Sequence, residues 1–153
     1  MVWTRARWRW IGAAAIMLAL VSLVVPFAVW RRHEQPSAPS ALVNVLLDDF
    51  HVHRTTAAVP AGIVRFQLVN NGPSTHEFIV VRTDRAPDRL PLQRDGLTVD
   101  EEGPGVDDVD EAEGLDIADR RTLTLDLAPG HYVLFCNMEG HYLGGMHAAF
   151  TVR

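Results

Sequence analysis

The chain has 153 residues, which is enough for one domain and a short additional segment. Its formal net charge of −5 is divided unevenly, because residues 1–32 hold five arginines and no acid, whereas the remainder holds nine arginines against 19 acids. An acidic remainder argues against nucleic-acid binding and suits a basic protein partner. The single cysteine excludes an internal disulfide.

The first predicted element is a membrane-spanning helix over residues 11–30. This run contains no charged residue, and about 20 apolar residues cross a bilayer. Tryptophans flank or end it as in an aromatic belt, at Trp3, Trp8, Trp10 and Trp30. Three arginines before the run and two after it favour residues 1–10 in the cytoplasm. A single-pass plasma-membrane protein is expected, with its domain on the extracytoplasmic side. A cleaved signal peptide is the alternative, and it places the domain on the same side.

Residues 31–41 contain two prolines and two serines and predict a linker. The domain then spans residues 42–153, where no long amphipathic helix pattern occurs. Alternating or β-branched runs predict strands at Leu42–Leu47, Ile63–Val69, Phe78–Val81, Leu123–Leu127, Tyr132–Phe135 and Ala148–Val152. Turn residues separate these runs, most clearly the Asn-Asn-Gly-Pro of residues 70–73. Short strands divided by turns predict an all-β sandwich or barrel.

Residues 83–119 do not fit this pattern. They contain three prolines, and residues 100–119 hold ten acids and no base. Because like charges repel, we expect an acidic excursion that stays solvated and mobile outside the core. A calcium loop is the alternative, but the glycine and terminal glutamate of an EF-hand are absent.

The chemistry is concentrated near the C-terminus. A thiolate, an imidazole and a thioether follow one another as Cys-x4-His-x4-Met at Cys136, His141 and Met146. Glycines between them allow the loop to fold closely around an ion. His76 begins the predicted strand after the Asn-Asn-Gly-Pro turn, and two strand ends of a sandwich can meet at one pole. A buried free cysteine with unrelated neighbours is the alternative interpretation.

This ligand set predicts the metal. Two imidazoles and a thiolate in one plane, with a weak axial methionine, are typical of blue copper. One copper ion is therefore expected at His76, Cys136, His141 and Met146. The pair His51 and His53 resembles half of a multicopper-oxidase motif, but without its partners it predicts a solvated strand face.

The sequences His-Glu-Phe-Ile-Val-Val from His76 and Phe-Cys-Asn-Met-Glu-Gly-His-Tyr-Leu-Gly-Gly-Met from Phe135 resemble the cupredoxins, the plastocyanin and azurin family. The ligand spacing is most similar to rusticyanin- and sulfocyanin-type members. The resemblance implies a Greek-key β-sandwich over residues 42–153 with copper near one pole. It also implies that the Glu77 amide points at the Cys136 sulfur. Glu77 itself departs from the asparagine that ties the two ligand loops in plastocyanin and azurin.

The expected function is one-electron transfer by a monomer that is not an enzyme, since multicopper enzymes need further copper sites. The redox partner would be a cytochrome or terminal oxidase, reached through a His141 ring edge in a small apolar patch. The alternative is an extracytoplasmic copper chaperone or copper-storage protein. The methionine-rich clusters of chaperones are absent from residues 42–153.

Overall fold

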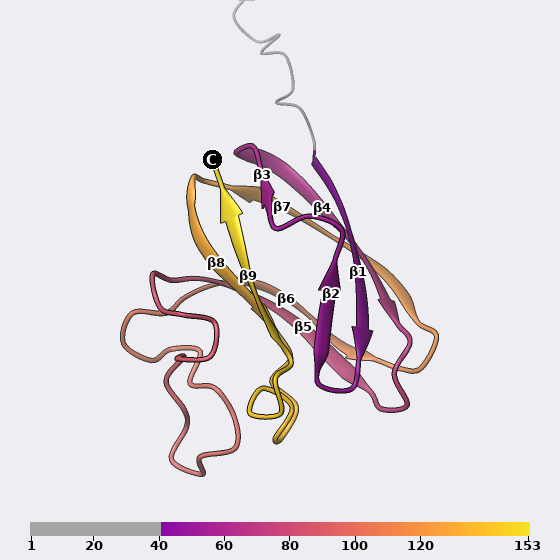
Figure 1. Cartoon of the computed structure of the whole chain (residues 1–153), viewed down its shortest axis with the longest axis vertical. Coiled ribbons are helices and arrows are strands. Elements are labelled where there is room, and N and C mark those ends of the chain that lie inside the picture. Colours follow the sequence, from indigo (N-terminus) through magenta and orange to yellow (C-terminus); the bar gives the residue numbers. More distant parts are fainter. Residues whose placement is uncertain (1–40) are drawn as a thin grey trace, which may run out of the picture. The chain divides into compact units, whose positions relative to one another are not determined.

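The computed structural model describes residues 41–153, which form two packed β-sheets (Figure 1). The strands are β1 (Ala41–Asp48), β2 (His51–Arg54), β3 (Ala58–Val59), β4 (Gly62–Asn70), β5 (His76–Arg82), β6 (Asp107–Leu115), β7 (Arg120–Leu127), β8 (Gly130–Phe135) and β9 (His147–Val152). One sheet has the order β2-β1-β4-β7 and the other β3-β9-β8-β5-β6. The predicted all-β sandwich is confirmed, and all six predicted strands lie within observed ones.

Alternation of side chains builds the core between the sheets. In β1, Val43, Val45 and Leu47 point inward and their neighbours point outward. The same alternation buries Phe66 in β4, where its ring contacts those of Phe78 and Phe150 from the opposite sheet. The alternating pattern therefore identified the inward face of each of these strands.

In β5, four consecutive residues, Phe78–Val81, are buried because both of its faces are covered. Its inner face joins the core between the sheets. Its outer face, with Ile79 and Val81, packs in a second hydrophobic cluster against Leu90, Val99 and Val106. The expectation that residues 83–119 stay outside the core is therefore wrong. The apolar residues scattered through this segment cover one face of the five-stranded sheet.

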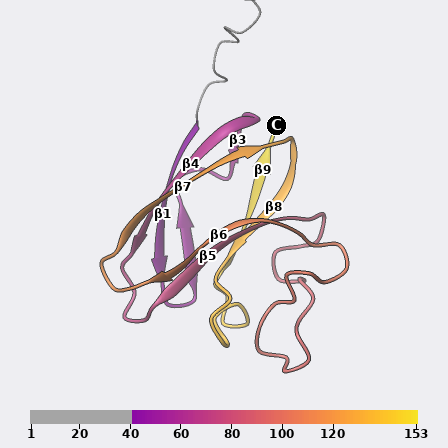
Figure 2. The same cartoon turned by 180° about the vertical axis from the view of Figure 1, so that it is seen from behind.

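The most acidic part of the same segment is β6, an edge strand antiparallel to β5 (Figure 2). Ala112 and Leu115 are buried in the main core, whereas the carboxylates of β6 are exposed. The prediction that these carboxylates are solvated is confirmed, but sequence analysis missed the strand. Charges on an exposed edge hinder pairing with another chain.

Among residues 41–153, no helix is long and apolar enough to cross a membrane. The predicted cytoplasmic N-terminus (1–10), membrane span (11–30) and nearly all of the linker (31–41) lie outside the described residues. The chain enters the sandwich at Ala41, at the end opposite the β1–β2 and β4–β5 turns and the loop that follows β8 (Figure 1).

Candidate metal centre

Three of the predicted ligands converge at the end of the sandwich that holds the β4–β5 turn and the loop after β8. One ligand atom from each of His76, Cys136 and His141 lies within 4.8 Å of the others. His76 is the first residue of β5, and Cys136 directly follows β8, which pairs antiparallel with β5. The strand pairing therefore brings together two ligands that are 60 residues apart.

The separations of the donor atoms fit a metal ion. Cys136 Sγ lies 3.5 Å from His141 Nδ1 and 4.0 Å from His76 Nδ1. Bonds of about 2.0 Å to nitrogen and 2.3 Å to sulfur, at trigonal angles, place the two donors roughly 3.7 Å apart. The observed distances lie on either side of that value, so a single ion bound by all three atoms fits this cluster.

The loop from Cys136 to Met146 closes on itself. The Cys136 amide donates to the Met146 carbonyl at 3.1 Å, and the Met146 amide donates to the His141 carbonyl at 3.0 Å. Gly140 and Gly145 adopt positive φ angles of 81° and 109°, a backbone conformation that side chains disfavour. These turns return the fully buried Met146 to the cysteine end of the loop.

The cysteine sulfur is buried and receives an amide. The Glu77 N–H donates to Cys136 Sγ at 3.3 Å, which confirms the predicted contact. Burial raises the pKa of the Cys136 thiol, and the amides of Glu77 and Met138 oppose this rise. Metal binding requires the thiolate, so these amides favour the charge that the ion needs.

Burial and the nearby His141 lower the pKa of His76, although Asp49 and Asp48 oppose this effect. A neutral imidazole is the form that binds a metal. His141 is half-buried and its ring meets that of His76 edge-on, with centroids 5.2 Å apart. The two imidazole rings therefore contact each other directly.

Two asparagines hold the backbone next to the predicted ligands. Buried Asn70 donates to the carbonyls of Ser74 and Leu115 and accepts the Gly72 amide, which fixes the turn before His76. Asn137, directly after the cysteine, forms two hydrogen bonds with the backbone of Val99. In the sequence, only the position of Asn137 directly after Cys136 indicated that this side chain could hold the ligand loop.

Sequence analysis also missed that the turn between β1 and β2 places a side chain next to the metal site. Phe50 in this turn has a φ angle of 65°, and its ring meets His141 with centroids 5.6 Å apart. Phe50 is 44% exposed and Leu143 is 52% exposed. The half-buried His141 therefore contacts the exposed Phe50, and the exposed Leu143 follows it by two residues on the loop.

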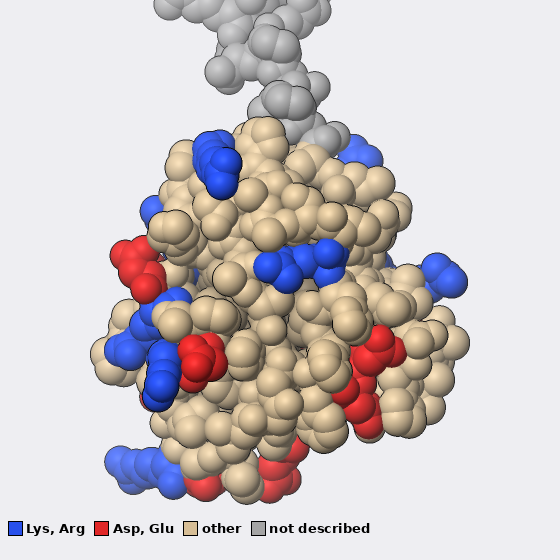
Figure 3. Space-filling model, in the orientation of Figure 1, with Lys and Arg blue, Asp and Glu red and all other residues tan. Residues whose placement is uncertain are grey.

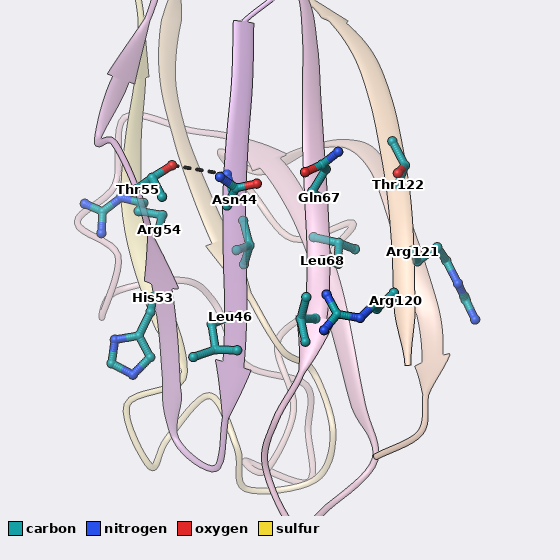
Figure 4. Close-up of a pocket in the computed structure, with 12 residues that line it drawn as sticks. Asn44, Leu46, His53, Arg54, Thr55, Gln67, Leu68, Arg120, Arg121 and Thr122 are labelled. Atoms are coloured by element: carbon teal, nitrogen blue, oxygen red, sulfur yellow. Dashed lines mark hydrogen bonds between the residues drawn. The ribbon is translucent and has the colours of Figure 1, made fainter. Parts of the chain in front are cut away.

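The remaining candidates do not form a second centre among residues 41–153. His51 and His53 are exposed on β2 with stacked rings, which confirms the predicted solvated face. The outer face of the four-stranded sheet has a shallow hollow where Asn44, Gln67 and Thr122 project (Figure 4). His53 is its only metal-ligating side chain, so this hollow lacks a ligand set.

Comparisons with known proteins agree with this geometry. The sulfocyanin (SoxE) domain family matches residues 52–153. No curated protein sequence matches the chain.

Among solved structures, the chain is similar to auracyanin from the photosynthetic bacterium Roseiflexus castenholzii, with 20% identity and a TM-score of 0.53 over 76% of this chain and 99% of that chain. It is similar to auracyanin B, with 25% identity and a TM-score of 0.53 over 78% of this chain and 92% of that chain. It is also similar to rusticyanin from Thiobacillus ferrooxidans, with 20% identity and a TM-score of 0.54 over 76% of this chain and 79% of that chain.

The fold is that of the blue copper proteins, as the resemblance implied. The donor set and the family together identify the cofactor as one type 1 copper. The chain belongs to the sulfocyanin (SoxE) domain family of cupredoxins.

Proposed function

We propose that the protein is a one-electron carrier whose copper would be held by His76, Cys136, His141 and Met146. The observation that carries this proposal is the convergence of two imidazoles and a thiolate within 4.8 Å of one another. Copper bound there would accept one electron from a donor in passing from Cu(II) to Cu(I) and would release it to an acceptor in returning to Cu(II). The soft sulfur ligands suit Cu(I), and the imidazole ligands, which are intermediate in softness, suit Cu(II).

The fold would hold the proposed ligands in nearly fixed positions. His76, Cys136 and Met146 are fully buried, and backbone hydrogen bonds close the loop that holds the last two. A carrier benefits from such a site because little has to move when the electron arrives or leaves. A chaperone must hand its metal to a partner and needs accessible ligands. The burial therefore favours a carrier over a chaperone, and we propose no catalytic role.

The electron would leave through His141. It is the only half-buried residue of the four proposed ligands. Its ring meets that of the exposed Phe50, and the exposed Leu143 follows it by two residues on the same loop. An exposed apolar patch favours a protein contact. A partner docked on Phe50 and Leu143 would approach the imidazole edge directly.

We infer that this partner is a basic redox protein such as a cytochrome or terminal oxidase. The acidic edge strand β6 supports this inference, because charge complementarity steers encounter. By contrast, the face in Figure 3 carries scattered charges of both signs. We further propose a monomer anchored in the plasma membrane by residues 11–30, with its copper domain on the extracytoplasmic side.

Copper titration of the full-length protein tests the proposal. We expect an intense visible band from the thiolate–copper bond in the wild type and none in Cys136→Ala. Met146→Gln should keep a copper site whose reduction potential is lower, since the axial ligand tunes the potential. His131→Ala, in an exposed position on β8, serves as the control and should keep the wild-type band. A blue band in the Cys136 variant would exclude this function.

A further inference from the structure

The turn between β1 and β2 places a carboxylate behind one copper ligand. The two nitrogens of the His76 ring have different neighbours, since Nδ1 lies 4.0 Å from Cys136 Sγ and Nε2 lies 3.3 Å from Asp49 Oδ1. His76 is fully buried, so water does not reach its Nε2 atom. The carboxylate therefore lies on the nitrogen that does not face the thiolate.

Both atoms of this contact have unmet hydrogen-bonding capacity. Asp49 Oδ1 and His76 Nε2 are buried, and neither has a hydrogen-bond partner within residues 41–153. Buried polar groups are nearly always paired. Their separation only slightly exceeds the usual hydrogen-bond range of about 2.7–3.2 Å. A hydrogen bond between the two atoms would satisfy both of them.

The surrounding residues hold this pair together. The Ser74 hydroxyl donates to the second carboxylate oxygen of Asp49 at 3.2 Å, which orients the carboxylate. Gly72 lies so close that an added Cβ would be 2.7 Å from His76 Nε2 and 2.9 Å from the Asp49 amide. The Gly72 amide is itself fixed by the Leu47 carbonyl. Any larger residue at position 72 would push the carboxylate and the imidazole apart.

We propose that Asp49 is a positioning residue of the metal centre, whose carboxylate accepts the Nε2–H of His76 and leaves Nδ1 free to bind copper. This inference rests on the proposed copper ligands. Carboxylate–histidine–metal arrangements fix the tautomer and raise the basicity of the ligand. The carboxylate also adds a negative charge close to the ion, where the low dielectric strengthens its effect. Both effects stabilise Cu(II) relative to Cu(I).

The first test is the reduction potential of copper-loaded, full-length Asp49→Asn. Removing the charge should shift the equilibrium toward Cu(I) about tenfold, which corresponds to a rise of about 59 mV in the potential. The visible band should persist, because all four proposed ligands remain. Asp48→Asn is the matched control, since it removes the same charge one residue away, where the side chain contacts His53 and Asn71 instead.

The shift in Asp48→Asn should be clearly smaller. Equal shifts in the two variants would overturn the proposal, because they would indicate a general charge effect and not a contact. No shift in Asp49→Asn with an intact band would overturn it as well. A wild type without the visible band would instead contradict the proposed function, so the two failures are distinguishable.

A second measurement does not depend on the Asp49→Asn variant. In the Cu(I) form of the wild type, NMR of ¹⁵N-labelled histidine should show His76 protonated at Nε2, with a proton that exchanges slowly with water. Asp49→Ala removes the acceptor and should accelerate that exchange at least tenfold. A wild-type His76 without an Nε2 proton, or exchange that is unchanged in Asp49→Ala, would refute the assignment.

Discussion

Asn137 connects the ligand loop to the segment that covers the outer sheet face, and replacing it with alanine should loosen both. Its Oδ1 accepts the Val99 amide at 2.6 Å, and its Nδ2 donates to the Val99 carbonyl at 3.1 Å and to Glu101 Oε1 at 2.6 Å. Asn137→Ala removes all three hydrogen bonds. Val99 is buried, so its amide and carbonyl would lose their partners in a place that water hardly reaches.

The magnitude follows from the burial of these groups. A buried donor or acceptor left unpaired costs about 1–3 kcal/mol, whereas a typical hydrogen bond contributes about 0.5–1.5 kcal/mol net. Two of the three bonds serve the buried Val99 backbone, and solvent can partly replace the bond to Glu101. We therefore expect Asn137→Ala to lower the free energy of unfolding by about 2–4 kcal/mol.

Urea unfolding of the full-length protein, followed by far-UV circular dichroism, measures this change. Tryptophan fluorescence is unsuitable because all four tryptophans lie within residues 1–30. Gln93→Ala is the control, since Gln93 makes an exposed hydrogen bond to Asp100 in the same segment. Such a surface change should stay within about 0.5 kcal/mol. If Asn137→Ala were no more destabilising than Gln93→Ala, the proposed support of the ligand loop would be wrong.

Phe50→Gly should change the free energy of unfolding by less than about 1 kcal/mol, because the relief of left-handed backbone strain offsets the lost ring contacts. It should nevertheless slow electron self-exchange, measured by NMR line broadening in mixtures of the two redox states, and an unchanged rate would contradict the proposed exit. Although Glu111 is largely exposed, partial desolvation and nearby Glu101 raise the pKa of its carboxyl above the ordinary value of 4.5. The folded state therefore binds that proton more tightly, and the resulting stabilisation is lost as pH rises above 4.5. Glu111→Gln should therefore reduce the fall in urea midpoint between about pH 4.5 and pH 7, and a pH profile identical to that of the wild type would refute this. Neutralising the exposed acids of β6 should slow electron transfer to a basic partner at low salt, with the difference fading at high salt and the copper spectrum unchanged. Stopped-flow kinetics at several salt concentrations tests this, and salt-independent rates would exclude steering. These acids are Asp107, Asp108, Asp110, Glu111 and Glu113.

Local patterns predicted the elements whose signals lie within a few residues. The alternation of β4 and the Cys-x4-His-x4-Met spacing both belong to single stretches of chain. The structure confirms the alternation of β4 and brings Cys136 and His141 together with His76. The segment 83–106 was misread because its buried residues, Leu90, Val99 and Val106, are isolated among polar ones and follow no period. They are buried by tertiary contact with β5, which no local pattern encodes.

The acidic strand β6 was missed for a related reason. Its carboxylates indicated a solvated loop, and an exposed edge strand is solvated as well. Only Ala112 and Leu115 distinguish the two cases, since both are buried in the main core. Charge therefore predicted the environment of these residues correctly, and the error lay in equating that environment with a lack of secondary structure.

The residues around the ligands depend on strand register. β1 runs parallel to β4 with Leu47 opposite Asn70, and the Leu47 carbonyl accepts the amides of both Asn71 and Gly72. This register brings the β1–β2 turn to the copper pole, with Asp49 behind His76 and Phe50 against His141. A slip of one residue would reverse the faces of β1 and move both side chains away. The ligand motif, which lies mostly in one stretch of chain, predicted the ion, whereas the pairing of β1 with β4 determines which other residues surround the proposed ligands.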